Sequence, residues 1–169
     1  PLGNGFVFSR EQFSDEHKMF EQTAKEFGEN RILPVYEKLN VLNKDLSLEI
    51  FREIGGLGFL GVDVPEEYGG LALDKTTSCI IVDAMSAGRN ASIMVTVSAH
   101  TGIGMLPIIW YGNKEQKKKY LPKLSSGEWM SCYCLTESGA GSDALSGSTT
   151  AVLNNEETHY ILNGQKIFV

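Results

Sequence analysis

The stretch that most constrains the fold of this chain is Trp129–Asp143, in which strand-like residues give way to a loop of small residues. In residues 129–136, successive side chains would point to opposite faces of a strand, and both faces are largely apolar. A buried strand is therefore predicted. Glu137–Asp143 then contains two glycines, two serines and two carboxylates, without a large apolar side chain. A strand that ends in such a loop can present backbone amides to a phosphate or a flat cofactor.

The character of the sequence changes at Ser125–Gly127, and this change predicts the domain organisation. The residues before it carry helical patterns, and those after it predict further strands at about 148–153, 158–162 and 165–169. The expected fold class is α+β, with an all-helical domain at 1–127 and the beginning of a β domain at 128–169. Asn163-Gly164 predicts a hairpin turn. The last strand stops in the middle of its pattern, so we expect a fragment of a longer protein.

Side chains typical of N-caps predict where the helices begin. Ser14, Ser47 and Asn90 are the expected caps, and a further helix is expected to begin at Asp74. The corresponding helices are expected to end near Phe27, Gly55, Ala87 and Tyr111, and a further helix is expected at Lys114–Leu124.

The most apolar segment, residues 91–111, approaches the length of a membrane span. His100, Thr101 and Pro107 interrupt it, and it lacks flanking basic anchors. A buried central helix, kinked or broken near Pro107, is the preferred interpretation, and no transmembrane segment is predicted. His100 is expected to be a hydrogen-bonded core residue.

Charge and cysteine content exclude several classes of function. A net charge of −6 argues against nucleic-acid binding. Three cysteines provide no disulfide framework. Cys132 and Cys134 form a C-x-C pair without a second pair at metal-site spacing, so core packing is expected and no metal site is predicted.

Gly139–Ala144 fits the loose dinucleotide pattern G-x-G-x-x-A. That pattern requires a following helix, whereas residues 145–150 are rich in Ser, Thr and Gly, so a Rossmann fold is rejected. Ser142 lies outside the G-x-S-x-G context of a nucleophile elbow and is not interpreted as a nucleophile.

Four segments together resemble the acyl-CoA dehydrogenase family, in the same order and at similar spacing. They are Pro65–Gly70, Tyr120–Leu124, Tyr133–Asp143 and Tyr160–Lys166. The resemblance covers nearly the whole chain but only the first part of the family's plan. It implies an N-terminal helical bundle followed by the first strands of a truncated β-barrel domain. It also implies FAD as cofactor, acyl-CoA as substrate and trans-2-enoyl-CoA as product.

The resemblance also implies which residues lie along the FAD. They are Tyr133, Cys134, Leu135, Thr136, Gly141, Ser142, Phe168 and Val169. Thr136 would face the pyrimidine edge of the flavin, where donors favour the reduced form. Ser142 would also contact the acyl-CoA, and Phe168-Val169 match the family's aromatic-aliphatic pair beside the flavin ring. Ser138 stands where many members carry proline, and Phe168 replaces a frequent tryptophan.

No catalytic residue is assigned, because the family's usual glutamate base lies in a C-terminal domain. Glu137 is interpreted as structural. Thr96 and Ala99 are expected to line the acyl tunnel, and the small Ala99 favours long acyl chains. The fragment alone is expected to be inactive.

The resemblance further implies an electron-transfer flavoprotein as partner and a homo-oligomer for the full-length protein. The expected location is the bacterial cytoplasm or the mitochondrial matrix. Two alternatives remain, namely an acyl-CoA oxidase and a non-enzymatic helical interaction module.

Overall fold

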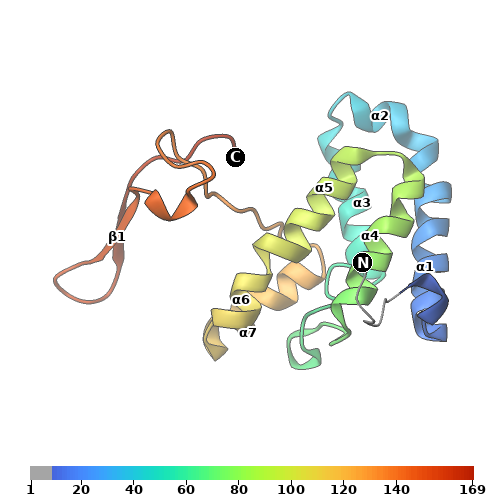
Figure 1. Cartoon of the computed structure of the whole chain (residues 1–169), viewed down its shortest axis with the longest axis horizontal. Coiled ribbons are helices and arrows are strands. Elements are labelled where there is room, and N and C mark those ends of the chain that lie inside the picture. The colour runs from blue at the N-terminus through green and yellow to red at the C-terminus, as the bar shows by residue number, and fades with distance from the viewer. Residues whose placement is uncertain (1–8) are drawn as a thin grey trace, which may run out of the picture. The chain divides into compact units, whose positions relative to one another are not determined.

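The computed structural model describes residues 9–169, and the chain divides into two compact units. The first unit ends at Ser131 and the second comprises Cys132–Val169. The first is helical and the second contains a two-stranded antiparallel sheet (Figure 1), so the α+β fold class is confirmed. The predicted domain boundary, between residues 127 and 128, falls just before this division.

The first unit consists of α-helices joined by short 3-10 and π-helical turns. The α-helices are α1 (Asp15–Phe27), α2 (Tyr36–Asn40), α3 (Lys44–Gly56), α4 (Lys75–Met85), α5 (Ala91–Ala99), α6 (Leu106–Tyr111) and α7 (Lys114–Ser125). The turns are η1 (Arg10–Gln12), η2 (Gly28–Ile32), η3 (Leu33–Val35), η4 (Glu66–Tyr68), η5 (Ser86–Gly88) and η6 (His100–Gly104).

Two of the predicted N-caps, Ser14 and Asn90, are confirmed, and Asp74, where a helix is predicted to begin, is the N-cap of α4. The side chains of Ser14, Asp74 and Asn90 each accept a hydrogen bond from the amide three residues later, at 3.1, 2.8 and 2.9 Å. Each bond satisfies one of the amides that lack a partner at the start of a helix. The helices α1, α4 and α5 therefore begin where the sequence predicts.

The predicted cap Ser47 is wrong, because α3 begins earlier. Asn43 is its N-cap, and its side chain accepts a hydrogen bond from the Leu46 amide at 3.1 Å. The Ser47 hydroxyl donates instead to the Asn43 carbonyl, at 2.8 Å. Both residues are good caps, and the one nearer the N-terminus adds a further turn to the helix.

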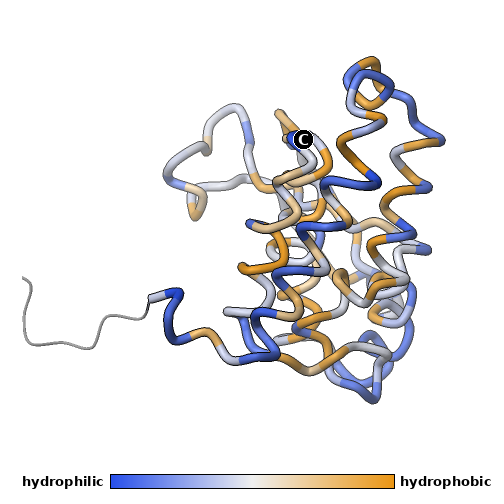
Figure 2. The backbone as a smooth tube through the Cα atoms, turned by 90° about the vertical axis from the view of Figure 1, so that its right-hand side faces the viewer, coloured by the Kyte–Doolittle hydropathy of each residue, from blue (hydrophilic) through white to orange (hydrophobic). Residues whose placement is uncertain are grey.

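The core of the first unit lies between the apolar faces of its helices. Figure 2 shows apolar and polar positions interspersed along much of the helical unit, as expected where one face of a helix is buried. Residues of this core are Ala24, Ile32, Leu39, Ile50, Phe51, Ile54, Phe59, Leu60, Val62, Ile81, Met85, Ile93 and Val97. A smaller cluster, with Val64, Met105, Leu121 and Leu124, packs beneath α6 and α7.

The apolar segment 91–111 is interrupted at η6, a π-helical turn, and not at Pro107. Pro107 lies in the first turn of α6, where its missing N–H costs no hydrogen bond. By length and composition the segment could cross a membrane: its most apolar 18-residue window has a mean hydropathy of 1.5. Only 28% of that window is buried, so the prediction of a buried central helix is wrong for most of its residues. A single segment of this kind is weak evidence for a membrane span.

In the second unit, β1 (Thr150–Leu153) pairs with β2 (Tyr160–Asn163), with Thr150 opposite Asn163 and Leu153 opposite Tyr160. A short 3-10 turn, η7 (Ala144–Ser146), precedes them. The turn of the hairpin therefore lies at residues 154–159, and the hairpin predicted at Asn163-Gly164 is wrong. Residues 165–169 do not form the predicted strand.

The strand predicted at residues 129–136 is also absent. Within residues 9–169, its one ladder-like backbone bond runs from the Ile167 amide to the Thr136 carbonyl, at 2.9 Å. Without a paired strand its faces remain uncovered, and Tyr133 is 46% exposed. Cys132 and Cys134 are exposed free thiols for the same reason, so the prediction that they pack in the core is wrong.

Candidate functional site

The glycine-rich loop of the second unit is closed by a tight turn. Glu137 and Ala140 exchange two backbone hydrogen bonds, each 3.1 Å long, and place Ser138 and Gly139 at the tip. A methyl group added at Gly139 or Gly141 would meet no atom within 4 Å. The outer side of the loop is therefore open to a ligand.

The inner side of the loop is held by the carboxylate of Glu137, which is 6% exposed. One oxygen, Oε2, accepts hydrogen bonds from the amide and the hydroxyl of Ser148, at 2.6 and 2.8 Å. The other, Oε1, accepts from the Thr149 amide at 3.0 Å and from Lys166 Nζ at 2.7 Å. Glu137 thus accepts four hydrogen bonds from Ser148, Thr149 and Lys166, which is consistent with the structural role expected for it.

These bonds favour the ionised form of Glu137. The hydrogen bond from Lys166 lowers the pKa of Glu137 most, followed by the bonds from Thr149 and Ser148. Burial acts in the opposite direction and is outweighed. The carboxylate therefore stays charged throughout the neutral and mildly acidic range.

Lys166 also ties the loop to the C-terminal segment. Its ammonium donates to the Leu135 carbonyl at 2.9 Å as well as to Glu137. The next residue, Ile167, donates its amide to Thr136. Two successive residues of segment 165–169 thus hold the predicted flavin-facing residues in place.

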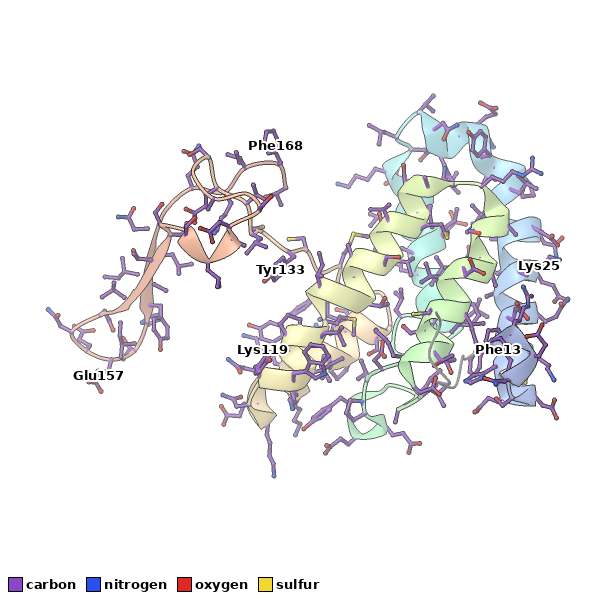
Figure 3. The ribbon with its side chains drawn as sticks, viewed as in Figure 1. Phe13, Lys25, Lys119, Tyr133, Glu157 and Phe168 are labelled. Atoms are coloured by element: carbon purple, nitrogen blue, oxygen red, sulfur yellow. The ribbon has the colours of Figure 1, made fainter. Side chains whose placement is uncertain are left out.

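Several backbone amides of the loop are free to bind a ligand. Within residues 9–169, the amides of Thr136, Gly141 and Ser142 have no protein hydrogen-bond acceptor. Apolar and aromatic side chains are exposed in the same unit, including Tyr133 and Phe168 (Figure 3). Free amides beside exposed apolar surface suit a ligand that combines an anionic group with a flat ring.

The second unit thus contains all eight residues predicted to contact FAD. Thr136 is partly buried, whereas Cys134, Gly141 and Ser142 are exposed. Phe168, 94% exposed, has a left-handed backbone with φ of 55°.

The predicted substrate residues Thr96 and Ala99 lie on α5, in the first unit. Thr96 lines a groove of about 340 Å³ together with Leu48 and Phe51 of α3 and Met130. Its hydroxyl donates to the Ser92 carbonyl at 2.8 Å, so the Thr96 hydroxyl already has a hydrogen-bond acceptor within its own helix. Ala99 is partly buried and does not line this groove.

The buried histidine expected in the central helix is confirmed. His100 is fully buried and packs edge-on against Phe51, with ring centroids 4.9 Å apart. Its Nδ1 accepts a hydrogen bond from the Ser131 amide at 3.0 Å, so Nε2 carries the proton and donates to the Leu124 carbonyl at 3.0 Å. This arrangement requires a neutral ring and anchors the end of the first unit.

Sequence reasoning did not find Ser148, Thr149 and Lys166 as supports of the loop. The one available signal was a carboxylate in a loop otherwise rich in small residues, and that signal marks Glu137 alone. Within residues 9–169, no group of three or more His, Cys, Asp or Glu side chains is arranged to hold a metal ion.

Comparison with known proteins gives a consistent result. The family model described as "Acyl-CoA dehydrogenase, N-terminal domain" matches residues 14–128. A probable acyl-CoA dehydrogenase of Bacillus subtilis (strain 168) is 47% identical over 163 residues, which make up 96% of this chain and 27% of that protein. The structure of an acyl-CoA dehydrogenase from Bacillus anthracis complexed with FAD matches with a TM-score of 0.88 and 52% identity. That match covers 95% of this chain and 27% of the other.

Relatives at 33% to 38% identity differ in the acyl group for which they are named. They include mitochondrial short-chain specific, isobutyryl-CoA, isovaleryl-CoA and very long-chain specific enzymes. They come from Homo sapiens, Dictyostelium discoideum, Solanum tuberosum and Macaca fascicularis, and the matches cover 88–96% of this chain and 24–39% of theirs. The chain therefore spans roughly a quarter to two-fifths of its relatives' length, and it belongs to the acyl-CoA dehydrogenase family.

Proposed function

We propose that the protein containing this sequence is an FAD-dependent acyl-CoA dehydrogenase that converts a fatty acyl-CoA to the trans-2-enoyl-CoA. The observation that carries the proposal is the open loop at 136–142, in which the amides of Thr136, Gly141 and Ser142 are free while the inner side is fixed by Glu137. A preformed site of this kind binds a ligand without first having to order the backbone. The FAD bound in the Bacillus anthracis relative supports the choice of cofactor.

In this proposal the residues of the second unit bind and orient the flavin. When bound, FAD supplies the acceptor for a hydride from the substrate. Thr136 donates hydrogen bonds to the pyrimidine edge, and Gly141 and Ser142 bind the pyrophosphate or the acyl-CoA. Tyr133, Cys134 and Leu135 line the cofactor, and Phe168 and Val169 cover the ring and exclude water from it.

The test is FAD binding and substrate-dependent flavin reduction by the protein that contains this sequence. We expect one tightly bound flavin per chain and bleaching of its visible absorbance when palmitoyl-CoA is added without oxygen. A correctly folded protein that binds no flavin would contradict the proposal.

Gly141→Ala sharpens this test, because the added methyl meets only open space in the ligand-free protein. Thermal stability without FAD should therefore stay unchanged, whereas FAD affinity should fall by about tenfold if the cofactor occupies that space. Gly139→Ala is the matched control, since its methyl also meets open space but Gly139 is not assigned a flavin contact.

We propose further that the enzyme prefers long acyl chains. Ala99 of α5 is small, and the resemblance to the family implies that a bulky polar side chain near this position would close the acyl tunnel. We expect kcat/KM to be higher for palmitoyl-CoA than for butyryl-CoA. Ala99→Gln should reverse this order, and an unchanged ratio would exclude a role for Ala99 in chain-length selection.

The proposed electron acceptor is an electron-transfer flavoprotein, and the proposed assembly is a homo-oligomer. An acyl-CoA oxidase would release hydrogen peroxide in air at the rate of turnover, so measuring peroxide distinguishes the two acceptors. The Bacillus subtilis and mitochondrial relatives support a location in the bacterial cytoplasm or the mitochondrial matrix.

A further inference from the structure

Lys166 occupies an unusual position for a lysine, because its ammonium is bound inside the loop instead of facing solvent. The Lys166 side chain is 27% exposed and that of Glu137 is 6% exposed. The Lys166 ammonium donates two hydrogen bonds to the loop, one to the Leu135 carbonyl and one to Glu137 Oε1. Lys166 is thus bonded directly to the loop that carries residues assigned to the flavin.

We propose that Glu137 and Lys166 form a positioning pair that fixes the flavin-facing residues and, through their opposite charges, sets the reduction potential of the bound flavin. This inference rests on the proposed function. It assigns a role to two residues that do not themselves bind the cofactor.

The positioning part follows from the connections that the pair makes. Glu137 bonds to Ser148 and Thr149, on the chain that leads from the loop into β1. Lys166 bonds back to Leu135, on the chain that leads into the loop. Three segments that are distant in sequence therefore meet at one ion pair, and the free amides on the outer side take their orientation from it.

The electrostatic part follows from the balance of charge. With both partners present, the carboxylate and the ammonium nearly cancel. Replacing one partner leaves the other as an uncompensated charge in a partly buried environment, where its field is screened less than at the surface. Since the pyrimidine edge of a flavin gains negative charge on reduction, a negative charge left beside it disfavours reduction and a positive charge favours it.

The test compares three variants of the FAD-loaded protein that contains this sequence. Lys166→Met should lower the midpoint potential of the flavin, and Glu137→Gln should raise it. The double variant should return toward the wild-type potential. FAD affinity should fall by about tenfold in each single variant, because each one loosens the loop. A purely structural role would move both single variants in the same direction.

The matched controls are Lys25→Met and Glu29→Gln, which make the same charge changes in an exposed ion pair of the first unit. Figure 3 shows Lys25 on the outer face of α1. These variants should leave both the potential and the FAD affinity unchanged. Lys166→Arg keeps the positive charge, so its flavin midpoint potential should lie closer to the wild-type value than that of Lys166→Met.

A second readout needs no flavin. In the ligand-free protein, Lys166→Met and Glu137→Gln should speed hydrogen exchange at the amides of Ser148, Thr149 and Ile167, and Lys25→Met should not. Unchanged exchange would refute the positioning role, and shifts of potential in one common direction would refute the electrostatic role. If the wild-type protein does not bind flavin, the proposed function is contradicted. The hydrogen-exchange result then still tests whether Glu137 and Lys166 position the loop.

Discussion

At the scale of single residues, His100 has the strictest requirements in the first unit. Both ring nitrogens are engaged, Nδ1 as acceptor from Ser131 and Nε2 as donor to Leu124. A second ring proton would face the Ser131 amide proton and lose that bond. Burial lowers the pKa of His100 and outweighs the bond to Leu124, which acts to raise it.

This protonation preference predicts a pH dependence of stability. The unfolded histidine takes up a proton near pH 6.5, whereas the folded one stays neutral to lower pH. The free energy of unfolding of the first unit should therefore decrease as the pH falls below about 6.5. Urea unfolding between pH 7.5 and 5 measures this slope.

His100→Gln should flatten the slope although it lowers stability overall. His159→Gln, at an exposed histidine of the second unit, should leave the slope as it is. An identical slope in wild type and His100→Gln would show that another group is responsible.

Two glycines of the π-helical turn provide a matched pair of substitutions. A methyl group at Gly104 would lie 2.2 Å from the Ser131 hydroxyl, which is itself bonded to His100, whereas one at Gly102 would meet nothing within 4 Å. Gly104→Ala should therefore lower the free energy of unfolding by about 1–3 kcal/mol. Gly102→Ala should be neutral or stabilising by up to about 1 kcal/mol. Equal effects in urea unfolding would contradict the close approach of Ser131 to Gly104.

Individual residues were predictable where the deciding interaction is local. The caps Ser14 and Asn90 act on amides three residues away, so both partners lie within one short stretch of sequence. The bond between Glu137 and Lys166 joins residues 29 apart, and no sequence pattern brings them together.

At the scale of elements, the N-cap of α5 is unusual because it is buried. Asn90 is 2% exposed, and its side chain also lies 3.5 Å from the Asn40 side chain. Asn90→Ala should lower the free energy of unfolding by about 1–2 kcal/mol, since a buried amide would lose its partner.

The matched control is Asn113→Ala, which removes the exposed cap of α7. Water can replace that cap, so its loss should cost less, about 0.5–1 kcal/mol in chemical denaturation. A larger loss in the free energy of unfolding for Asn113→Ala than for Asn90→Ala would contradict the claim that burial makes the Asn90 cap more costly to remove.

The strands were predicted less well than the helices, for a physical reason. A helix forms its hydrogen bonds within one segment, whereas a strand needs a partner that the local pattern does not identify. The run at 129–136 alternates as a strand should, yet it remains unpaired. Likewise, Gly164 does not form the predicted turn, but it allows a close approach to Thr149, whose Cα would lie 2.7 Å from an added methyl.

At the scale of the whole molecule, the two units differ in how much they bury. The first buries two apolar clusters, whereas every residue of β1 and β2 is exposed. A two-stranded hairpin without a covered face is marginally stable in water. Much of the order of the second unit therefore depends on the hydrogen bonds of Glu137.

Hydrogen exchange should reveal this difference directly. In the ligand-free chain, amides of α4 and α5 should be protected at close to the global free energy of unfolding, and those of β1 and β2 should exchange at nearly unprotected rates. Saturating FAD should slow exchange around Thr136 and Gly141 first. Equal protection of both units would contradict a division into units of unequal stability.

The π-helical turn in the central helix has a consequence for how this sequence tolerates change in length. A wide turn accommodates one residue more than a regular helical turn does. Deleting a single residue between His100 and Gly104 would remove this extra residue, so α5 and α6 could join as one regular helix while the later side chains keep nearly their present directions. A deletion within α5 itself would instead rotate every later side chain, including Trp110 and Tyr111, by about 100° about the axis, so we expect changes of length to be tolerated at this turn and rejected in α5.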